Sequence, residues 1–290
     1  MRRRRPAPLP DRDGVGPARV RLRGGAVLVE LASRFGEVAA EKVFNGEVVD
    51  ADGGVITPSS VLPPGAFVFL YRELPDEVDV PFDIPVLYRD DDIVVVDKPH
   101  FLATMPRGGH VAQTALVRLR RSLELPELSP AHRLDRLTAG VLLFTVRPEV
   151  RGAYQTMFAR GLVSKTYVAR SSSVSSVALP MIVRSRIIKH RSVLQAVEEP
   201  GEPNAETLVE ALGDGWYRLS PRTGRTHQLR VHMNSLGLPI DNDPLYPRVV
   251  EVAADDFSAP LRLVAQRLEF DDPLSGEPRS FVSAARAFGP

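Results

Sequence analysis

Two short, unbroken apolar runs occur in the middle of the chain, Ile93–Val96 (IVVV) and residues 141–146 (VLLFTV). Runs of this length without polar alternation predict strands that are buried on both faces. A turn is expected at Arg89–Asp92 before the first run, and Pro99 ends it. The segment SKTYVAR, residues 164–170, predicts another strand.

Apolar residues at helical spacing mark three further segments. Proline at the start or glycine at the end is typical of such helices. The predicted helices cover residues 113–123 (QTALVRLRRSL), 148–161 (PEVRGAYQTMFARG) and 227–237 (HQLRVHMNSLG). Helices and strands are interspersed without a regular strand–helix repeat, which favours an α+β fold over a doubly wound parallel sheet.

The pattern divides the chain into four parts. Residues 1–25 are rich in Arg and Pro and predict a flexible arm, because they cannot bury enough apolar area to fold. Residues 26–72 predict a small accessory module, a helix followed by short strands with glycine turns. The acidic stretch 73–85 predicts a linker, and residues 86–290 a larger domain.

Composition narrows the class of protein. The 290 residues are 43% hydrophobic and 25% charged, as in ordinary folded proteins. The chain has no cysteine, which excludes disulfides, thiolate nucleophiles and cysteine-bound metals. No apolar run is long enough to cross a bilayer, and the basic start lacks the apolar stretch of a secretory signal. We therefore expect a cytoplasmic protein without a membrane partner.

The balance of 37 basic against 36 acidic residues hides strong local charge. The net charge is +6 over residues 1–25, −8 over residues 73–97 and +7 over residues 101–170. The basic central segment, with its arginines at 118–121, is what a phosphate-binding surface requires. A solvated surface without a partner gives the same pattern, and GC-rich codons also give an excess of arginine. Charge alone leaves nucleic-acid binding open.

One polar cluster stands directly before an apolar strand, in AHRLDRLTAG. It contains His132, Arg133, Asp135, Arg136 and Thr138. A simple turn would explain it, with Asp135 accepting backbone hydrogen bonds. The alternative is a functional carboxylate held at the edge of the core, with cations close enough to keep it ionised.

A second cluster occupies residues 220–232, SPRTGRTHQLRVH. Gly224 can turn the chain before a helix that carries Arg225, His227, Gln228, Arg230 and His232. The arginines and the amides of the helix start suit an anion, although an ordinary amphipathic helix is the alternative. The spacing of five between the histidines does not fit a helical zinc site, so no metal is expected.

Together, HRLDRLTAG and GRTHQLRVH resemble the motifs of the RluA-type family of RNA pseudouridine synthases. The resemblance runs from about Val86 through IVVVDKP and SKTYVAR to GLPIDNDPLY at residues 237–246. It implies an α+β catalytic domain with a mixed, largely antiparallel sheet and a basic cleft. The accessory module is similar to the small RNA-binding modules that often precede such domains.

The resemblance also implies roles for individual residues. Asp135 matches the family's catalytic aspartate, Tyr167 the tyrosine that stacks on the target uracil, and Arg225 the arginine that pairs with the aspartate. Leu229 matches the aliphatic residue that packs against the pocket. Supporting or RNA-contacting roles are expected for His132, Arg133, Thr138, Lys165, His227, Gln228 and Arg230.

The implied reaction breaks the bond from ribose C1′ to uracil N1 and forms one to C5, without net redox change, so no cofactor is expected. Asp135 could attack C1′ or C6, or act as base at C2′. We expect a monomer acting on RNA, with 23S rRNA as first choice and tRNA as second. The alternatives are a catalytically silent RNA-binding protein of the same fold and a hydrolase, which would normally need a second carboxylate.

The sequence departs from the family pattern in three places. Ala139 stands where serine is usual, His100 and Phe101 follow DKP where a small residue and glycine are common, and GLPI continues with DNDPLY rather than Gly-Asp. None removes Asp135, Tyr167 or Arg225, so they bear on substrate fit rather than on reaction type.

Overall fold

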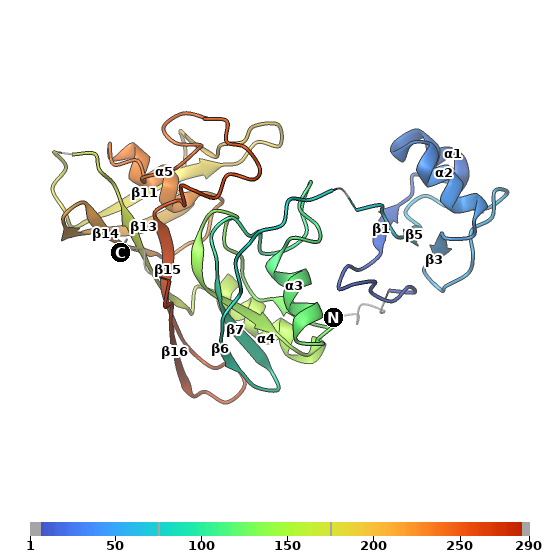
Figure 1. Cartoon of the computed structure of the whole chain (residues 1–290), viewed down its shortest axis with the longest axis horizontal. Helices are drawn as coiled ribbons and strands as arrows, with labels where there is room; N and C mark the ends of the chain where they lie inside the picture. Colours follow the sequence, from blue (N-terminus) through green and yellow to red (C-terminus); the bar gives the residue numbers. More distant parts are fainter. Residues whose placement is uncertain (1–6, 75, 175, 286–290) are drawn as a thin grey trace. The chain divides into compact units, whose positions relative to one another are not determined.

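The computed structural model describes residues 7–74, 76–174 and 176–285, which form two compact units, Met1–Asp76 and Glu77–Pro290 (Figure 1). No helix among the described residues is long and apolar enough to cross a membrane. Residues 1–6 of the expected flexible arm lie outside the described part. The remainder of that arm includes the strand β1, Ala18–Arg21, so residues 18–21 belong to the first unit instead.

The expected linker is shorter than predicted, because residues 77–85 lie on the second unit. The carboxylate of Glu77 accepts hydrogen bonds from the backbone N–H groups of residues 111–113, at 2.7 to 3.1 Å. The guanidinium of Arg118 donates to the carbonyls of Val80 and Phe82. These bonds lie outside the reach of sequence patterns, since each joins residues more than 30 positions apart.

The first unit has two helices and two small sheets. Helices α1 (Val27–Phe35) and α2 (Glu37–Phe44) pack on a three-stranded sheet of order β1-β5-β3, with β5 at Phe67–Leu70 and β3 at Val49–Asp50 (Figure 1). Strands β2 (Gly25–Ala26) and β4 (Val61–Leu62) form a separate pair. The prediction of strands after the first helix was wrong at α2, where Ala39 and Val43 bury one helical face.

The second unit contains an eleven-stranded sheet. Its main path runs β12-β11-β13-β14-β10-β15-β9-β7-β6, with β16 paired to β15 and β8 to β9. Of the strand pairs in the described chain, only β15 with β9 is parallel, which confirms the mixed, largely antiparallel sheet. The strands are β6 Val86–Arg89, β7 Ile93–Lys98, β8 Ser129–Pro130, β9 Ala139–Thr145, β10 Ser164–Arg170, β11 Met181–Ile188, β12 Val197–Glu199, β13 Ala205–Gly213, β14 Trp216–Pro221, β15 Leu263–Asp271 and β16 Pro278–Val282.

Strands β7 and β9 are buried on both faces, as their unbroken apolar runs predict. Val95 and Leu143 face the core around helix α4 (Pro148–Ala159), whereas Val96 and Leu142 face the core around helix α3 (Ala115–Ser122). All 13 residues of the two strands are buried. Helix α5 (Gln228–Ser235) packs with Leu229 and Met233 against β10, β13, β14 and β15.

Gly140 is required where β9 meets β15. Its φ is 112°, and a Cβ added there would lie 2.3 Å from the carbonyl oxygen of Ala265. The parallel pairing is short, joining Ala139 and Gly140 to Val264 and Ala265. A side chain at residue 140 would therefore push the two strands apart.

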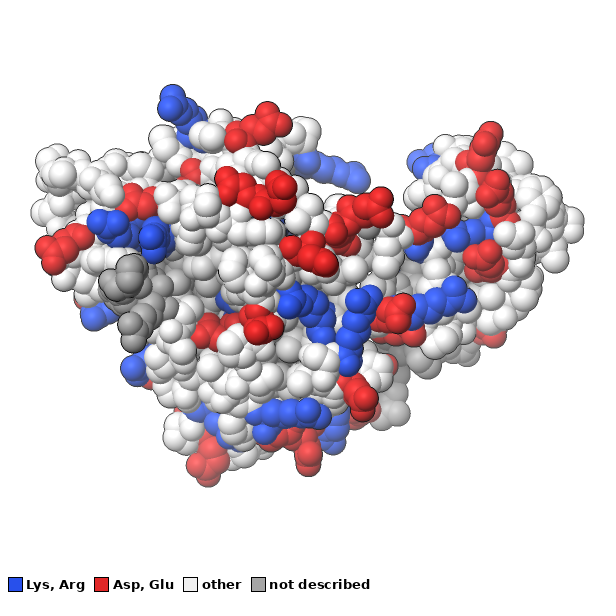
Figure 2. Space-filling model, in the orientation of Figure 1, with Lys and Arg blue, Asp and Glu red and all other residues white. Residues whose placement is uncertain are grey.

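On one face of the molecule, charge is more evenly distributed than it is along the sequence (Figure 2). On the face shown in Figure 2, basic and acidic side chains alternate over the surface. Acidic and basic segments are interleaved because the sheet places distant parts of the chain side by side. The arginines expected to bind phosphate at 118–121 are partly used within the fold, since Arg118 and Arg120 donate to backbone carbonyls.

Candidate active site

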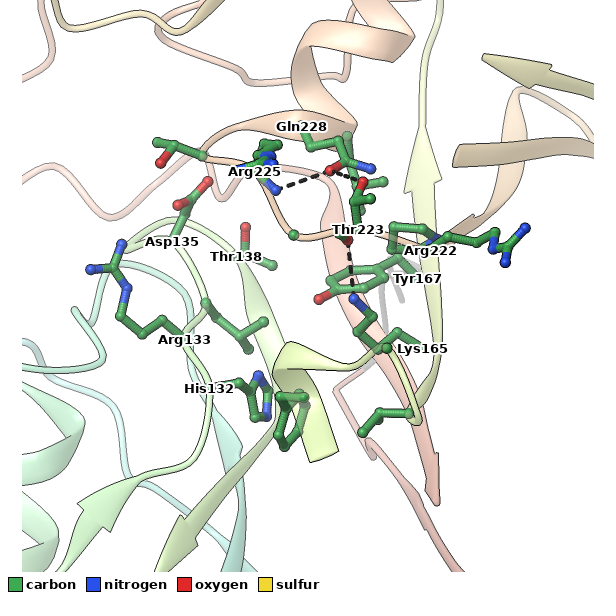
Figure 3. Close-up of a pocket in the computed structure, with 18 of the residues that line it drawn as sticks. His132, Arg133, Asp135, Thr138, Lys165, Tyr167, Arg222, Thr223, Arg225 and Gln228 are labelled. Carbon is green, nitrogen blue, oxygen red and sulfur yellow. Dashed lines mark hydrogen bonds between the residues drawn. The ribbon is translucent and has the colours of Figure 1, made fainter. Parts of the chain in front are cut away.

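A cleft of about 1200 Å³ lies in the second unit (Figure 3). The loop 131–138 ahead of β9 forms one wall, and β10, the end of β14, the loop 222–227 and the start of α5 form the other. The fold brings together every residue that the two motifs and SKTYVAR contributed to the predicted site: His132, Arg133, Asp135, Thr138, Lys165, Tyr167, Arg225, His227, Gln228, Leu229 and Arg230.

The loop that carries Asp135 is fixed by hydrogen bonds on both sides of it. Thr104 Oγ1 donates to the carbonyl of Leu134 and accepts from its N–H, at 2.8 and 3.1 Å. The N–H of Thr138 donates to the carbonyl of Asp135, closing a turn. The turn expected from the sequence is therefore present, and the Asp135 side chain is free to enter the cleft, where it is 29% exposed.

Asp135 faces Arg230 rather than Arg225. Arg230 Nη1 lies 3.8 Å from Asp135 Oδ2, and the guanidinium is itself only 3% exposed. Its Nε and Nη2 donate to the two carboxylate oxygens of Asp243, at 2.7 and 2.6 Å. Asp243 is fully buried. The ion pair with Asp243, together with the charge of Asp135, raises the pKa of Arg230 against the effect of burial.

The predicted ion pair between Asp135 and Arg225 is absent from the described residues. Arg225 is exposed, and its Nε donates to the carbonyl of Asn204 at 3.0 Å. The cause is local, because the buried side-chain oxygen of Gln228 accepts from the N–H of Arg225 and from the hydroxyl of Thr223. These two hydrogen bonds fix the loop before α5 and leave Arg225 at the mouth of the cleft.

Gln228 is thus fully used within the protein. Its Nε2 donates to the carbonyl of Glu206 and to the hydroxyl of Thr207. Lys165 is also engaged within the protein, because its Nζ donates to the carbonyl of Thr223 at 3.0 Å. Burial lowers the pKa of Lys165. Both side chains line the cleft and join its second wall to the sheet.

The side chain of His132 connects the loop 131–138 to β9 through a hydrogen bond and is uncharged. Its Nε2 accepts the N–H of Leu143 at 3.2 Å, and its ring stacks on Phe158 with 4.4 Å between centroids. Burial lowers its pKa to about 3. The imidazole therefore carries no charge near neutral pH and cannot attract a phosphate.

Tyr167 lies opposite Asp135 on β10, next to a register shift between Thr166 and Tyr167. Its ring contacts two core clusters and is half-buried. Burial, together with the charge of Asp135, raises the pKa of its hydroxyl. The phenol stays neutral, and its ring is available to the cleft.

The remaining predicted residues divide between surface and core. Arg133 is exposed on the loop beside Asp135. Thr138 and Leu229 are buried, with Leu229 in the core beneath α5. His227 adopts a left-handed φ of 57° at the start of α5, and its Nδ1 lies 3.0 Å from the Tyr246 hydroxyl.

Sequence reasoning missed Asp243, although it lies in the DNDPLY segment already noted as a departure. Asn242 takes a φ of 63°, a conformation that glycine adopts freely and asparagine tolerates better than most residues. The substitution of asparagine for the usual glycine therefore leaves Asp243 in place to bind Arg230.

Lys98, from the DKP motif, was also missed. It is fully buried, and its Nζ donates to the carbonyls of Pro99 and Leu102, each at 2.8 Å. Burial lowers its pKa to about 7, while the charge of Asp135 acts in the opposite direction. A lysine at the end of an apolar strand was the signal that could have identified it.

Comparison with known proteins agrees with the motifs. Residues 92–235 match the family described as RNA pseudouridylate synthase. The dual-specificity RNA pseudouridine synthase RluA of Escherichia coli is 33% identical over 208 residues, covering 69% of this chain and 92% of that protein. The human pseudouridylate synthase RPUSD2 is 35% identical over 57% of this chain, but the chain spans only 31% of its length.

Longer alignments and a solved structure agree with this result. The ribosomal large subunit pseudouridine synthase D of Xanthomonas campestris is 32% identical over 287 residues, covering 87% of this chain and 82% of that protein. The human RNA pseudouridylate synthase domain containing 1 shares the fold, with a TM-score of 0.54, 24% identity and coverage of 69% of this chain and 83% of that one. The chain belongs to the RluA-type family of RNA pseudouridine synthases.

Proposed function

We propose that this protein isomerises uridine to pseudouridine in large-subunit ribosomal RNA, with Asp135 as the reacting carboxylate. The observation that carries the proposal is the placement of a partly exposed Asp135 across the cleft from the neutral aromatic ring of Tyr167 (Figure 3). Exposed arginines surround this pair at the mouth, among them Arg133, Arg160, Arg222 and Arg225.

The reaction sets clear demands on the site. The N1–C1′ bond breaks, a C5–C1′ bond forms, N1 gains a proton and C5 loses one, so the composition of the nucleoside is unchanged. Attack of Asp135 on C1′ or C6, and proton abstraction at C2′, all require an ionised carboxylate with an accessible oxygen. Arg230 supplies a nearby positive charge without a close hydrogen bond to the reacting oxygen.

Tyr167 suits a base turned out of the RNA stack. A flipped uracil loses stacking with its neighbours, and an aromatic side chain can return about 1–3 kcal/mol of it. Because the pKa of Tyr167 is raised, the ring carries no charge that would repel the uracil or a phosphate.

We propose ribosomal RNA rather than tRNA as the substrate because the relatives named for ribosomal RNA align over a larger share of this chain. The two relatives named ribosomal large subunit pseudouridine synthase D align over 88% and 87% of this chain. A coverage of 88% and 87% of the 290 residues is more than the second unit, Glu77–Pro290, contains, so the match extends into the first unit. The relative named tRNA pseudouridine(32) synthase aligns over 75% of this chain and 48% of its own length.

The first unit is proposed as an accessory RNA-binding module. Two of its arginines stack on aromatic rings. The guanidinium carbon of Arg12 lies 3.7 Å from the ring centroid of Tyr71, and that of Arg19 lies 3.6 Å from the ring centroid of Phe67. Such flat, charged pairs offer both a cation for phosphates and a surface for bases. A cytoplasmic monomer acting without a cofactor completes the proposal.

The hydrolase alternative is disfavoured by the carboxylates near the cleft. Asp243 is fully buried and bound to Arg230, and Glu206 is engaged by Arg184 and Arg222. Neither has the free oxygen that a second catalytic carboxylate would need.

The test uses the hydrogen that leaves C5. RNA containing [5-³H]uridine should release tritium when incubated with the protein, whereas Asp135→Asn should reduce release by at least about 10³-fold and keep RNA affinity. Deletion of the gene, followed by mapping of pseudouridines at nucleotide resolution, identifies the target. Loss of a tRNA site would replace the rRNA proposal, and normal release by Asp135→Asn would refute the role of Asp135.

A further inference from the structure

The two nitrogens of the His227 ring have different surroundings. Nδ1 lies 3.0 Å from the hydroxyl of the buried Tyr246, and the two rings meet edge to face with 5.8 Å between their centroids. The ring is half-buried and lines the cleft, and Nε2 has no hydrogen-bond partner among the described residues. Because Nδ1 is bound to the wall and the nitrogens lie on opposite sides of the ring, Nε2 is directed toward the cleft.

The hydrogen bonds of Tyr246 determine which nitrogen of His227 carries the proton. A tyrosine hydroxyl has a single proton to donate. The Tyr246 hydroxyl accepts the N–H of the buried Ala196 and donates to its carbonyl, each at 2.8 Å. Its proton is therefore used, so the contact with His227 requires a proton on Nδ1. In the neutral imidazole, Nε2 then carries a free lone pair.

The imidazole of His227 is neutral at neutral pH. Burial lowers its pKa below the ordinary value, and the positive charge of Arg230 lowers it further, while the charges of Asp135 and Asp243 act in the opposite direction. A neutral imidazole with an unprotonated nitrogen facing a cleft can accept a proton from a substrate.

His232 shows, by contrast, how a structural histidine is held in the same helix. Its Nδ1 lies 2.9 Å from Thr207 Oγ1, and its Nε2 lies 3.1 Å from Ser185 Oγ. The ring is fully buried and does not line the cleft. Both nitrogens of His232 are thus used within the fold, whereas His227 uses one and presents the other.

The backbone of His227 favours other residues at this position. Its φ of 57° and ψ of 16° are left-handed, a conformation that glycine and asparagine adopt with less strain. The side chain makes no capping hydrogen bond to α5, so the start of the helix does not explain the histidine. Strained backbone of this kind is concentrated at functional sites.

His227 lies close to the reacting carboxylate. The N–H of Val231 donates to the carbonyl of His227, so residue 227 belongs to the first turn of α5. Residues three positions apart lie on one side of a helix, and Arg230, three positions after His227, lies 3.8 Å from Asp135. The effect of the Asp135 charge on the pKa of His227 agrees with this placement.

Other titratable groups of the cleft are less suited to accept a proton. The raised pKa of Tyr167 keeps its hydroxyl protonated. Glu206 is bound by two arginines, and Lys165 Nζ donates to a backbone carbonyl. The Nε2 of His132 already accepts a backbone N–H. Besides Asp135 itself, this leaves His227 as the base of the cleft among the described residues.

We propose that Nε2 of His227 accepts the proton that leaves C5 of the target uracil. The inference rests on the proposed function, because it assigns a step of that isomerisation. The step follows formation of the C5–C1′ bond, so it is common to every route by which Asp135 can act.

The proton and electron balance of this step is closed. Once C5 is bonded to C1′, it still carries its hydrogen, and a double bond joins N1 to C6. The C5–H bond breaks, its proton passes to Nε2, and its electron pair forms the C5–C6 double bond. The π electrons between N1 and C6 move to N1, which takes a proton from water. The imidazolium of His227 then releases its proton to water and returns to the neutral form.

The central experiment replaces His227 by asparagine. Asparagine tolerates the left-handed backbone, and its amide can still donate to the Tyr246 hydroxyl, but it has no basic nitrogen. The single-turnover rate of tritium release from RNA containing [5-³H]uridine should fall roughly 10²- to 10⁴-fold, while the RNA dissociation constant changes less than about threefold. Filter binding measures the dissociation constant.

An isotope measurement separates a base from a residue that only positions the RNA. Pseudouridine formation is timed with RNA that carries either hydrogen or deuterium at C5 of the target uridine. Without the base, removal of the C5 hydrogen becomes the slow step, so the ratio of the two rates should be larger in His227→Asn than in the wild type. A slower variant with an unchanged ratio would overturn the proposal, because some other step would then depend on His227.

His190→Gln is the matched control for the loss of an imidazole. His190 is exposed, pairs with Glu199 and does not line the cleft, so its replacement should change neither the rate nor the isotope ratio. A wild-type rate of release by folded His227→Asn would overturn the role of His227, as would a loss of RNA affinity with a normal rate at saturation. Normal release by Asp135→Asn would instead refute the proposed function on which the inference rests.

Discussion

Arginine side chains have opposite surroundings in the interior of the cleft, here called its inner wall, and at its solvent-exposed mouth. On the inner wall, Arg230 is 3% exposed and bound to a fully buried carboxylate. At the mouth, the side chain of Arg222 is 81% exposed and lies 3.4 Å from Glu206. A desolvated charge acts through its geometry, whereas a solvated one acts through long-range attraction that salt screens. Changes on the inner wall should therefore alter rate or stability, and changes at the mouth should alter RNA affinity.

The largest expected effect comes from the backbone beneath the inner wall. Gly140→Ala should lower the free energy of unfolding by about 3–5 kcal/mol, because the new Cβ combines a positive φ with overlap against Ala265. Gly213→Ala is the control, since its φ is 93° but nothing lies within 4 Å of the added Cβ. It should cost only about 1 kcal/mol. Urea unfolding of both variants gives the comparison, and equal losses would show that the overlap is relieved.

The next effect tests Tyr167 as a stacking surface. Tyr167→Ala should reduce the rate with saturating RNA by about 10- to 100-fold, because roughly 1–3 kcal/mol of stacking is lost. Tyr167→Phe keeps the ring and should stay within about threefold of the wild type. A large loss in the phenylalanine variant would show that the hydroxyl, rather than the ring, serves the reaction.

A third prediction concerns acid stability. Since the folded-state pKa of His132 is lowered to about 3, the unfolded chain binds a proton below about pH 6.5 that the folded chain does not. Stability therefore falls as the pH drops from about 6.5 toward 3, by about 1.4 kcal/mol per pH unit for this residue. His132→Gln should reduce that slope in urea unfolding at several pH values. His100 and His232, whose pKa values are lowered to about 4, add to the wild-type slope and remain in the variant.

The smallest effects are expected from substitutions of arginines at the mouth of the cleft. Arg133→Gln and Arg222→Gln should each weaken RNA binding a few-fold and reduce the salt slope by about one, with the rate at saturation unchanged. Arg267→Gln removes another exposed arginine, which lies outside the cleft lining, and it should change neither quantity. A lower rate at saturating RNA in either mouth variant would end the distinction between the two regions.

The sequence predicted best where burial determines structure. The apolar runs at β7 and β9 indicated strands buried on both faces, and α3, α4, α5 and β10 form within the predicted segments. Residues 41–44 at the end of helix α2 were predicted as strand because a segment of eight residues is too short to distinguish the helical period from the strand period. The two motifs also located the cleft, since all of their predicted site residues line it.

The arrangement within the cleft was less accessible to prediction. Whether Arg225 or Arg230 faces Asp135 depends on Gln228, which holds the loop through bonds to Thr223 and the backbone. Asp243 acts on Arg230 from 13 positions away, through a turn that needs the left-handed Asn242. Hydrogen bonds between residues distant in the sequence determine which arginine faces Asp135, and the periodicity of apolar residues does not predict such bonds.

The two walls of the cleft belong to different halves of one sheet. Asp135 comes from the half that contains β6, β7 and β9, whereas Tyr167 and Arg230 come from the half that contains β10 to β15. The halves are joined by the two-residue parallel pairing beside Gly140. Because the ladder is so short here, the halves are held together mainly by a buried core cluster that joins β7 and β9 to β15, so side-chain packing rather than a continuous ladder sets the position of the carboxylate relative to the ring.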